Sequence, residues 1–167
     1  MWRLVTPDLQ IDRVEELGVA RLRGLGLDTL LLDVDCTLKG YRSEWPTPEV
    51  EAWLEGLRAA GIGLCLISNG RAARIRRLAE RLGLPVISQA CKPFPFGCRA
   101  GLRRLGADRR RTAMVGDQLF ADVMAGRLAG VTSILVRPIR PEEEHWYTRM
   151  KRPLERIVLA RIRQVPP

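Results

Sequence analysis

Short apolar runs and longer amphipathic stretches alternate along most of the chain. Five runs rich in aliphatic and β-branched residues are bounded by Gly, Pro or Asp, which is typical of buried strands. These predicted strands are 29–34, 62–67, 85–87, 112–115 and 131–136. Strands that alternate with helices are the pattern of a parallel sheet covered by helices, so the sequence predicts an α/β fold.

Helix start and stop signals lie between the predicted strands. Thr47 and Pro48 supply an N-cap and a first-turn proline for a helix that ends near Gly61. Three further helices are expected over 71–82, 94–105 and 119–129, and each is followed by a glycine suited to a helix C-terminus. Because the connections are short, we expect a single domain over residues 1–167 with a core of about 25–137.

Both ends of the chain carry helical patterns outside this core. Asp12 and Glu15 resemble a capping box for a short N-terminal helix. Near the C-terminus, apolar residues recur at helical spacing with arginines between them. They are Met150, Leu154, Ile157, Val158 and Ile162, with Arg152, Arg156, Arg161 and Arg163. We expect this tail either to pack on the core or to lie at a membrane surface.

Length and composition fit a protein with its own hydrophobic core. The chain has 167 residues, of which 46% are hydrophobic, so it can bury a core without disulfides. No apolar run approaches the roughly 20 residues that cross a bilayer, and the first ten residues lack the apolar stretch of a signal peptide. The four cysteines form no CxxC pair and the chain has one histidine, so a zinc site is not expected. We expect free thiols and a cytoplasmic protein.

The net charge of +9 would suit nucleic acid, an anionic membrane or an acidic substrate. However, the 28 basic residues comprise 25 arginines and only three lysines, a bias that codon usage in a GC-rich genome also produces. The charge by itself therefore does not select a partner.

Chemically reactive residues follow four of the predicted strands. Ligands of an open α/β sheet bind beyond the carboxyl ends of the strands. The four groups are the acids Asp33 and Asp35, then Ser68, Asn69 and Gly70, then Lys92, then the acids Asp117 and Asp122. Close acids repel unless a cation joins them, and the start of a helix suits an anion. Each group alone also fits a turn or a helix cap, but together they indicate a metal and phosphate site.

These motifs resemble those of the haloacid dehalogenase superfamily of phosphohydrolases. The chain matches DxDxT at 33–37, the Ser/Thr motif at Ser68, the lysine motif at Lys92 and GDxxxxD at 116–122. The resemblance implies a three-layer Rossmannoid fold with a five-stranded, mainly parallel sheet and no substantial cap domain. Two departures are Cys36, where Asn or Gly is usual, and Ala121, where Thr is common. A thiol at Cys36 would make the site oxidisable.

Further strings resemble the branch of subclass IIIA that is similar to phosphatidylglycerophosphate phosphatases. They are VGDQLFADV, ILVRPI and the tail residues Thr148, Arg149, Arg152, Pro153, Leu154 and Glu155. This resemblance implies a phosphatase that acts in phospholipid synthesis, at the cytoplasmic face of the membrane.

The resemblance also implies a role for each motif residue. Asp33 is the nucleophile that forms an aspartyl-phosphate, and Asp35 is the acid and base, for which a crowded carboxylate site is expected to raise one pKa. Mg²⁺ would be held by Asp33, the backbone carbonyl of Asp35 and Asp117, with Asp122 in support. Lys92 also counts as catalytic. The phosphoryl group would be bound by Thr37, Ser68, Asn69, Gly70 and Lys92.

The absence of a cap insertion bears on the substrate, because an open site suits a large substrate or one embedded in a surface. After Ser68, four arginines recur at near-helical spacing, either as a solvated face or as a docking surface for anionic lipid. They are Arg71, Arg74, Arg77 and Arg81. Together with this open site, the resemblance implies a Mg²⁺-dependent phosphatase for phosphatidylglycerophosphate, peripheral at the inner face of the membrane.

Two other functions fit parts of the same sequence pattern. A phosphatase for a nucleotide, a sugar phosphate or a phosphoprotein is the alternative. A nucleic-acid-binding protein on the same scaffold is supported only by the charge, and the presence of every catalytic residue type argues against it. The sequence leaves the oligomeric state open.

Overall fold

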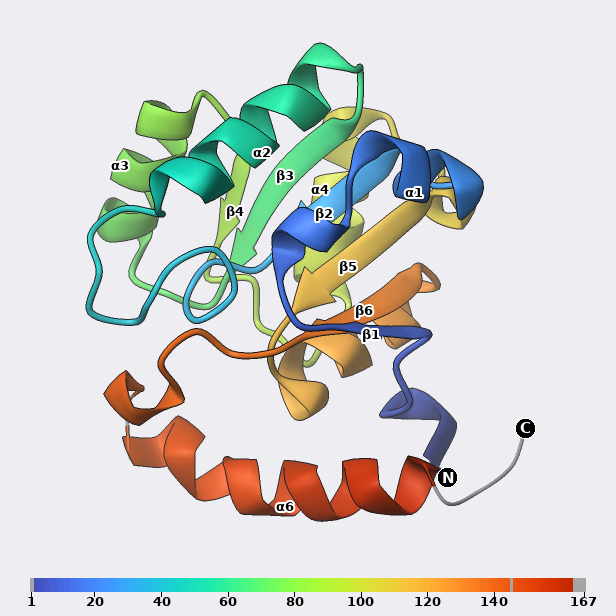
Figure 1. Cartoon of the computed structure of the whole chain (residues 1–167), viewed down its shortest axis with the longest axis vertical. Coiled ribbons are helices and arrows are strands. Elements are labelled where there is room, and N and C mark those ends of the chain that lie inside the picture. The colour runs from blue at the N-terminus through green and yellow to red at the C-terminus, as the bar shows by residue number, and fades with distance from the viewer. Residues whose placement is uncertain (1, 145, 164–167) are drawn as a thin grey trace.

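The computed structural model describes residues 2–144 and 146–163 (Figure 1). Six strands form one parallel sheet in the order β1-β6-β5-β2-β3-β4. The strands are β1 Leu9–Ile11, β2 Thr29–Leu32, β3 Gly63–Ser68, β4 Val86–Ser88, β5 Thr112–Gly116 and β6 Thr132–Val136. The helices are α1 Val19–Gly24, α2 Pro48–Ala59, α3 Ala72–Leu82, α4 Phe96–Leu105, α5 Met124–Ala129 and α6 Trp146–Arg163. The predicted α/β fold is confirmed.

Helices cover both faces of the sheet, which makes three layers. Leu30 and Leu32 of β2 pack with residues of α1, α2 and α3, whereas Leu31 packs with residues of α4 and α5. Successive side chains of a strand point to opposite faces. A strand that is buried on both faces needs apolar residues at every position, which is why these strands read as continuous apolar runs.

The sheet has six strands rather than the five that were expected. The additional strand, β1, pairs with β6 at the edge of the sheet. It has three residues, of which only Ile11 is buried, so its pattern is too short to distinguish from a loop.

The capping interaction that was predicted for Glu15 is made by the next residue, Glu16. The carboxylate of Glu16, and not that of Glu15, accepts hydrogen bonds from the backbone N–H groups of Asp12 (2.7 Å) and Arg13 (2.9 Å). The turn that follows is a short 3-10 helix, Val14–Glu16, and α1 begins after it.

The helix expected over 119–129 begins instead with a π-helical turn, Leu119–Val123, and continues as α5. The carbonyl of Gln118 accepts hydrogen bonds from the N–H groups of both Asp122 (2.9 Å) and Val123 (3.2 Å). The side chain of Asp122 in turn accepts from the N–H of Gln118 at 3.0 Å. Such turns occur frequently at functional sites, and this one carries an acid of the motif.

The C-terminal helix α6 packs on the C-terminal side of the sheet, where it runs along the lower edge of Figure 1. Val158 of α6 is buried against Leu119, Val123 and Leu135. Within the described residues, no helix is long and apolar enough to cross a membrane.

β2 lies at the centre of the sheet, between β3 and β5. The chain adds β3 and β4 on one side of it and β5, β6 and β1 on the other. The crevice of an open α/β sheet lies where the strand order reverses in this way, so the residues that follow β2, β3 and β5 border a common site.

Candidate active site

Three carboxylates meet beyond the carboxyl ends of β2 and β5. Asp33 follows β2, Asp117 follows β5 and Asp122 lies in the π-helical turn. One oxygen from each lies within 4.8 Å of the others, and all three residues are buried. Gly116 makes room for this arrangement, because a Cβ atom at that position would lie 2.2 Å from Cγ of Asp122. The spacing of the GDxxxxD motif therefore has a steric basis.

The ammonium of Lys92 joins two of these carboxylates. It is buried and donates to Asp33, to Oδ1 of Asp122 at 2.7 Å and to the carbonyl of Ile67 at 3.0 Å. Burial alone would lower the pKa of Lys92, but the two carboxylates outweigh it and raise the pKa, so the ammonium keeps its charge.

Asn69 binds the backbone of Lys92 in both directions. Its Nδ2 donates to the Lys92 carbonyl (2.9 Å), and its Oδ1 accepts from the Lys92 N–H (2.9 Å). The side chain that was expected to bind phosphate thus also holds the lysine loop in place, and Asn69 lines the cavity.

Thr37 and Ser68 are both buried, but they face different parts of the site. The Thr37 hydroxyl lies 3.0 Å from Oδ2 of Asp33 and 3.2 Å from Oδ1 of Asp117, between the carboxylates. Ser68 Oγ accepts a hydrogen bond from the N–H of Gly70 at 3.0 Å. A cavity of about 600 Å³ opens over the site, and its walls include Asp33, Asp35, Ser68, Asn69, Gly70 and Lys92.

Asp35 is held by two cations. Its carboxylate accepts from Nζ of Lys39 (2.9 Å) and from Nη1 of Arg74 (2.8 Å). Burial favours the neutral form of this carboxyl, but the hydrogen bonds from Arg74 and Lys39 outweigh it and lower the pKa of Asp35.

The pKa is raised at Asp33 and Asp117 and not at Asp35, where it was expected to be raised. Burial raises the pKa of Asp33 to about 7 and also raises the pKa of Asp117. Crowding was expected to make Asp35 the group with the raised pKa. It does not, because two cations, Lys39 and Arg74, bind Asp35 and outweigh its burial. Asp33 is more deeply buried, and the single cation that it meets within the described residues, Lys92, does not offset the effect of burial.

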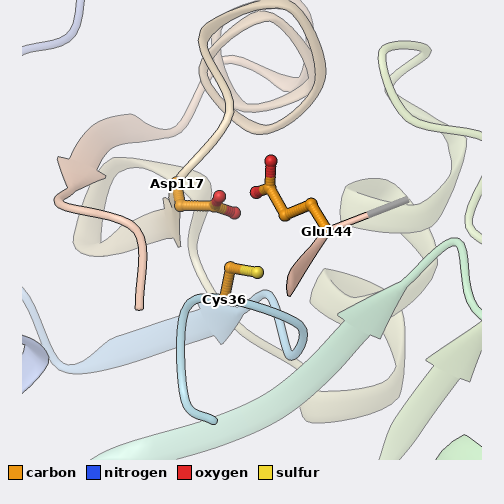
Figure 2. Close-up of side chains that lie close together, drawn as sticks. All are labelled: Cys36, Asp117 and Glu144. Atoms are coloured by element: carbon orange, nitrogen blue, oxygen red, sulfur yellow. The ribbon is translucent and has the colours of Figure 1, made fainter. Parts of the chain in front are cut away.

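Arg152 of α6 connects the C-terminal helix to this cluster. Its guanidinium donates to the carbonyl of Asp117 (2.7 Å) and to the Asp117 carboxylate, to Glu144 (3.1 Å from Nε to Oε2) and to Glu155 (3.1 Å). Figure 2 shows Glu144 facing Asp117 and Cys36 from the segment before α6. These three side chains have the composition of a second cation site, but Arg152 already supplies positive charge between the two carboxylates.

The Cys36 side chain is buried beside Asp117 and Glu144. Burial, with these two carboxylates in support, raises the pKa of the thiol, which keeps it protonated and unreactive. This disfavours the oxidation that the sequence suggested. The backbone of Cys36 has a φ of 63°, a left-handed conformation that Asn and Gly adopt more easily than other residues. The usual Asn or Gly at this position therefore has a conformational reason.

Two cationic partners in the site were missed by sequence reasoning. Lys39, like Lys92, is one of only three lysines among 28 basic residues, and this rarity is a signal that could have identified it. Arg152 carries no such signal, because the chain has 25 arginines.

The four arginines after Ser68 do not form one free face. Arg74 pairs with Asp35. Arg81 pairs with Glu51 at 3.0 Å and lies over the ring of Trp45 at 4.7 Å from its centroid. Arg71 borders the cavity and Arg77 is exposed. Half of the expected docking surface thus binds carboxylates of the same molecule.

The charges of the cluster leave room for one divalent cation. The carboxylates are Asp33, Asp35, Asp117, Asp122, Glu144 and Glu155, and the cations that bind them are Lys39, Lys92, Arg74 and Arg152. With every group ionised, six negative charges face four positive ones, which leaves a formal charge of −2. The donors Asp33, Asp117 and Asp122 are all hard oxygen ligands, which Mg²⁺ prefers.

Arg152→Leu tests how far α6 supports the cluster. We expect the free energy of unfolding to fall by about 3 kcal/mol, because a buried group of carboxylates loses its cation. The affinity for Mg²⁺ should fall by about 10- to 100-fold, as is usual when a partner of a metal ligand is removed. Urea unfolding and calorimetric titration with Mg²⁺ measure the two effects. Arg156→Leu, on the exposed side of the same helix, is the control, and equal behaviour of the two variants would contradict this role.

Comparison with known proteins is consistent with this geometry. The family model of haloacid dehalogenase-like hydrolases matches residues 8–130. "Probable phosphatase YqeG" of Bacillus subtilis is 27% identical over 95% of this chain and 91% of its own length. "Phosphatidylglycerophosphate phosphatase 1, chloroplastic" of Chlamydomonas reinhardtii is 26% identical over 95% of this chain and 62% of its own length. "Phosphoserine phosphatase" of Thermus thermophilus is 38% identical, but over 58% of this chain and 43% of its own length.

Solved structures share the fold at low sequence identity. The cobalt-bound deoxy-D-mannose-octulosonate 8-phosphate phosphatase of Haemophilus influenzae superposes with a TM-score of 0.56 at 17% identity, over 67% of this chain and 69% of that one. A hypothetical protein of Xanthomonas campestris superposes with a TM-score of 0.57 at 19% identity, over 84% of this chain and 79% of that one. These similarities support the α/β architecture and carry no statement about substrate.

Proposed function

We propose that this chain, which belongs to the haloacid dehalogenase-like hydrolases, is a Mg²⁺-dependent phosphatase that converts phosphatidylglycerophosphate to phosphatidylglycerol. The observation that carries the chemistry is the buried group of Asp33, Lys92 and Asp122 at the floor of an open cavity. The lipid substrate is supported by the similarity, over nearly the whole chain, to phosphatidylglycerophosphate phosphatases of an alga and a plant.

In the proposed reaction, a carboxylate oxygen of Asp33 attacks the phosphorus of the ester. A bond forms between that oxygen and phosphorus as the bond from phosphorus to the glycerol oxygen breaks. Asp35 donates a proton to the leaving oxygen and then accepts one from water, which attacks the aspartyl-phosphate and releases inorganic phosphate. Asp33 returns to its starting state.

The remaining residues neutralise and orient the phosphoryl group. Lys92 already lies against Asp33, and Ser68 and the N–H groups after it line the same cavity, so their positive charge and donors meet the phosphoryl oxygens. Asp33, Asp117, Asp122 and the backbone carbonyl of Asp35 would hold Mg²⁺, which neutralises phosphate charge when bound.

Arg74 has a place in this scheme that the sequence did not suggest. It lines the cavity and holds Asp35 as a carboxylate. A phosphate ester in the cavity offers its guanidinium a second anionic partner. We propose that this partner draws Arg74 from Asp35, which leaves Lys39 as the cation on that carboxylate. The loss of Arg74 raises the pKa of Asp35 toward the range in which it carries the proton that the leaving group needs.

A phosphate-release screen tests the function. With Mg²⁺ present, turnover of phosphatidylglycerophosphate in mixed micelles is compared with turnover of phosphoserine, nucleoside monophosphates and sugar phosphates. We expect kcat/KM for the lipid to exceed that for each soluble ester by at least about tenfold, the discrimination that contacts with a distinct substrate body provide. A higher value for phosphoserine would favour the function suggested by the Thermus thermophilus relative.

A further inference from the structure

α6 is apolar on two opposite sides. Its inner side packs on the core through Val158, Leu159 and Ile162. Its outer side exposes 69% of Met150, 54% of Leu154 and 54% of Ile157. An amphipathic helix that only covers a core needs one apolar stripe, so the outer residues have no role in holding α6 to the sheet.

The outer residues form a continuous stripe along the helix. Trp146, Met150, Leu154 and Ile157 are separated by four, four and three positions, which places them in a row on one side of a helix. Trp146 is 64% exposed, and Tyr147 beside it is 56% exposed. We call these five residues the outer stripe. Exposed apolar groups that are contiguous to this extent mark an interaction surface.

Positive charge accompanies the outer stripe. Arg149, Arg156 and Arg161 are exposed. Arg161 continues the row of the outer stripe four positions after Ile157, and Arg149 and Arg156 lie along one border of the stripe. Among the described residues 146–163, Glu155 is the only acid of the helix, and it is buried in an ion pair with Arg152. An aromatic and aliphatic stripe flanked by arginines, with no acid beside it, is the composition of a helix that lies in the headgroup layer of an anionic membrane.

The position of α6 relates this surface to the candidate active site. Thr148, in the first turn of α6, lines the cavity together with Glu144, which precedes the helix. Arg152 in the second turn binds Asp117. Thr148 and Arg152 lie on the inner side of α6, so a membrane that receives the outer stripe lies on the other side of the helix. A phosphorylated headgroup would reach the cavity past the N-terminal turn of α6, which carries Thr148.

We propose that the outer stripe of α6 docks the protein on an anionic lipid bilayer. The inference deepens the proposed lipid phosphatase function and rests on it for its biological meaning. A second copy of the chain is the less suitable occupant, because a symmetric pair would bring Arg149, Arg156 and Arg161 of two molecules together, and each chain has a net charge of +9. The arginines of α3 offer less, since Arg74 and Arg81 bind internal carboxylates.

Sedimentation with vesicles tests this surface without any turnover. The probes are vesicles of phosphatidylcholine alone and vesicles that also contain phosphatidylglycerol. The wild type should bind the anionic vesicles, and high salt should weaken binding by screening the arginines. Leu154→Glu and the double variant Met150→Glu with Ile157→Glu should each lower the affinity at least about tenfold, since they replace apolar groups that enter the lipid by charged ones.

Matched control variants come from the end of the sheet where the strands begin, opposite the end on which α6 packs. Leu25, which precedes β2, is 50% exposed, so Leu25→Glu makes the same chemical change on a similarly exposed residue and should leave vesicle binding unchanged. Arg156→Glu should also weaken binding to the anionic vesicles, because it reverses a charge beside the stripe. Arg110→Glu, at an exposed arginine before β5, is its control and should leave binding unchanged. Turnover of p-nitrophenyl phosphate by every stripe variant should stay within about twofold of wild type, which shows that the fold and the active site are intact.

Each other outcome has a defined meaning. Failure of the wild type to bind anionic vesicles overturns the proposal, as does binding that Met150→Glu with Ile157→Glu leaves unchanged. A dimer in analytical ultracentrifugation that this double variant dissociates would assign the stripe to a second copy. Stripe-dependent vesicle binding without hydrolysis of phosphatidylglycerophosphate in micelles would retain the docking surface and reject the proposed substrate.

Discussion

Asp33→Asn is expected to lower phosphate release by more than ~10³-fold, the order of loss that follows removal of a central catalytic group. An amide oxygen is a poor nucleophile, and the change removes charge while it alters almost no volume. The protein should remain folded. Because burial raises the pKa of Asp33 to about 7, the ionised carboxyl is disfavoured in the folded protein, and an uncharged amide should leave the melting temperature unchanged or raise it.

The measurement combines steady-state phosphate release with mass spectrometry of acid-quenched enzyme. Wild type should show phosphate on the peptide that contains Asp33, and the variant should not. Asp28→Asn is the matched control, because Asp28 lies before β2 as Asp33 lies after it. Its carboxylate lies away from the site and binds the exposed Arg111 (2.8 Å) and the Thr29 hydroxyl (3.1 Å). Activity of Asp33→Asn within tenfold of wild type would reject the aspartyl-phosphate mechanism.

Removal of the metal with EDTA is expected to lower activity by at least ~10²-fold, because a metal ion supplies several kcal/mol of charge stabilisation in such reactions. Mg²⁺ or Mn²⁺ should restore it, since the clustered ligands are oxygens of Asp33, Asp117 and Asp122. A zinc-selective chelator should have no effect. Full activity in excess EDTA would contradict the metal assignment.

The pH dependence of metal binding follows from the same carboxyls. The pKa values of Asp33 and Asp117 are raised in the fold, so without metal these groups cost stability as the pH rises from their ordinary pKa through the folded one. Protons leave both carboxyls in that range, and bound Mg²⁺ then offsets the repulsion. The rise in melting temperature on adding Mg²⁺ should therefore be larger at pH 8 than at pH 5.5. An equal rise at both values would place the metal elsewhere.

The sequence by itself determined most of the architecture, because the apolar runs of strands and the glycines that end helices reflect the local environment of each residue. β2 and β3 lie in the middle of a parallel sheet, and burial on both faces makes their sequences continuously apolar. Glycines after α3 and α4 adopt the left-handed conformation that ends a helix, as their positions indicated. The edge strand β1 was missed, since three residues with one buried side chain carry too little pattern to compete with a loop.

The main carboxylates and Lys92 were also determined by the sequence. Asp33 and Asp117 each follow a strand directly, and the carboxyl ends of parallel strands meet at one edge of a sheet. Residues at those positions therefore come together in any fold with this strand order. The oxygens of Asp33, Asp117 and Asp122 lie within 4.8 Å of one another. This proximity could be predicted without knowing which side chains form ion pairs.

Only the tertiary structure decided which cations serve these carboxylates. Arg152 lies 35 positions from Asp117 and Arg74 lies 39 from Asp35, and nothing in a chain with 25 arginines distinguishes either one. The orientation of α6 was also decided only by the tertiary structure. The spacing of its apolar residues predicted a helix, but both sides of that helix are apolar, so the sequence did not show which side faces the core. Pairing and packing depend on distances between elements that are remote in sequence, and these distances exist only once the sheet has brought the elements together.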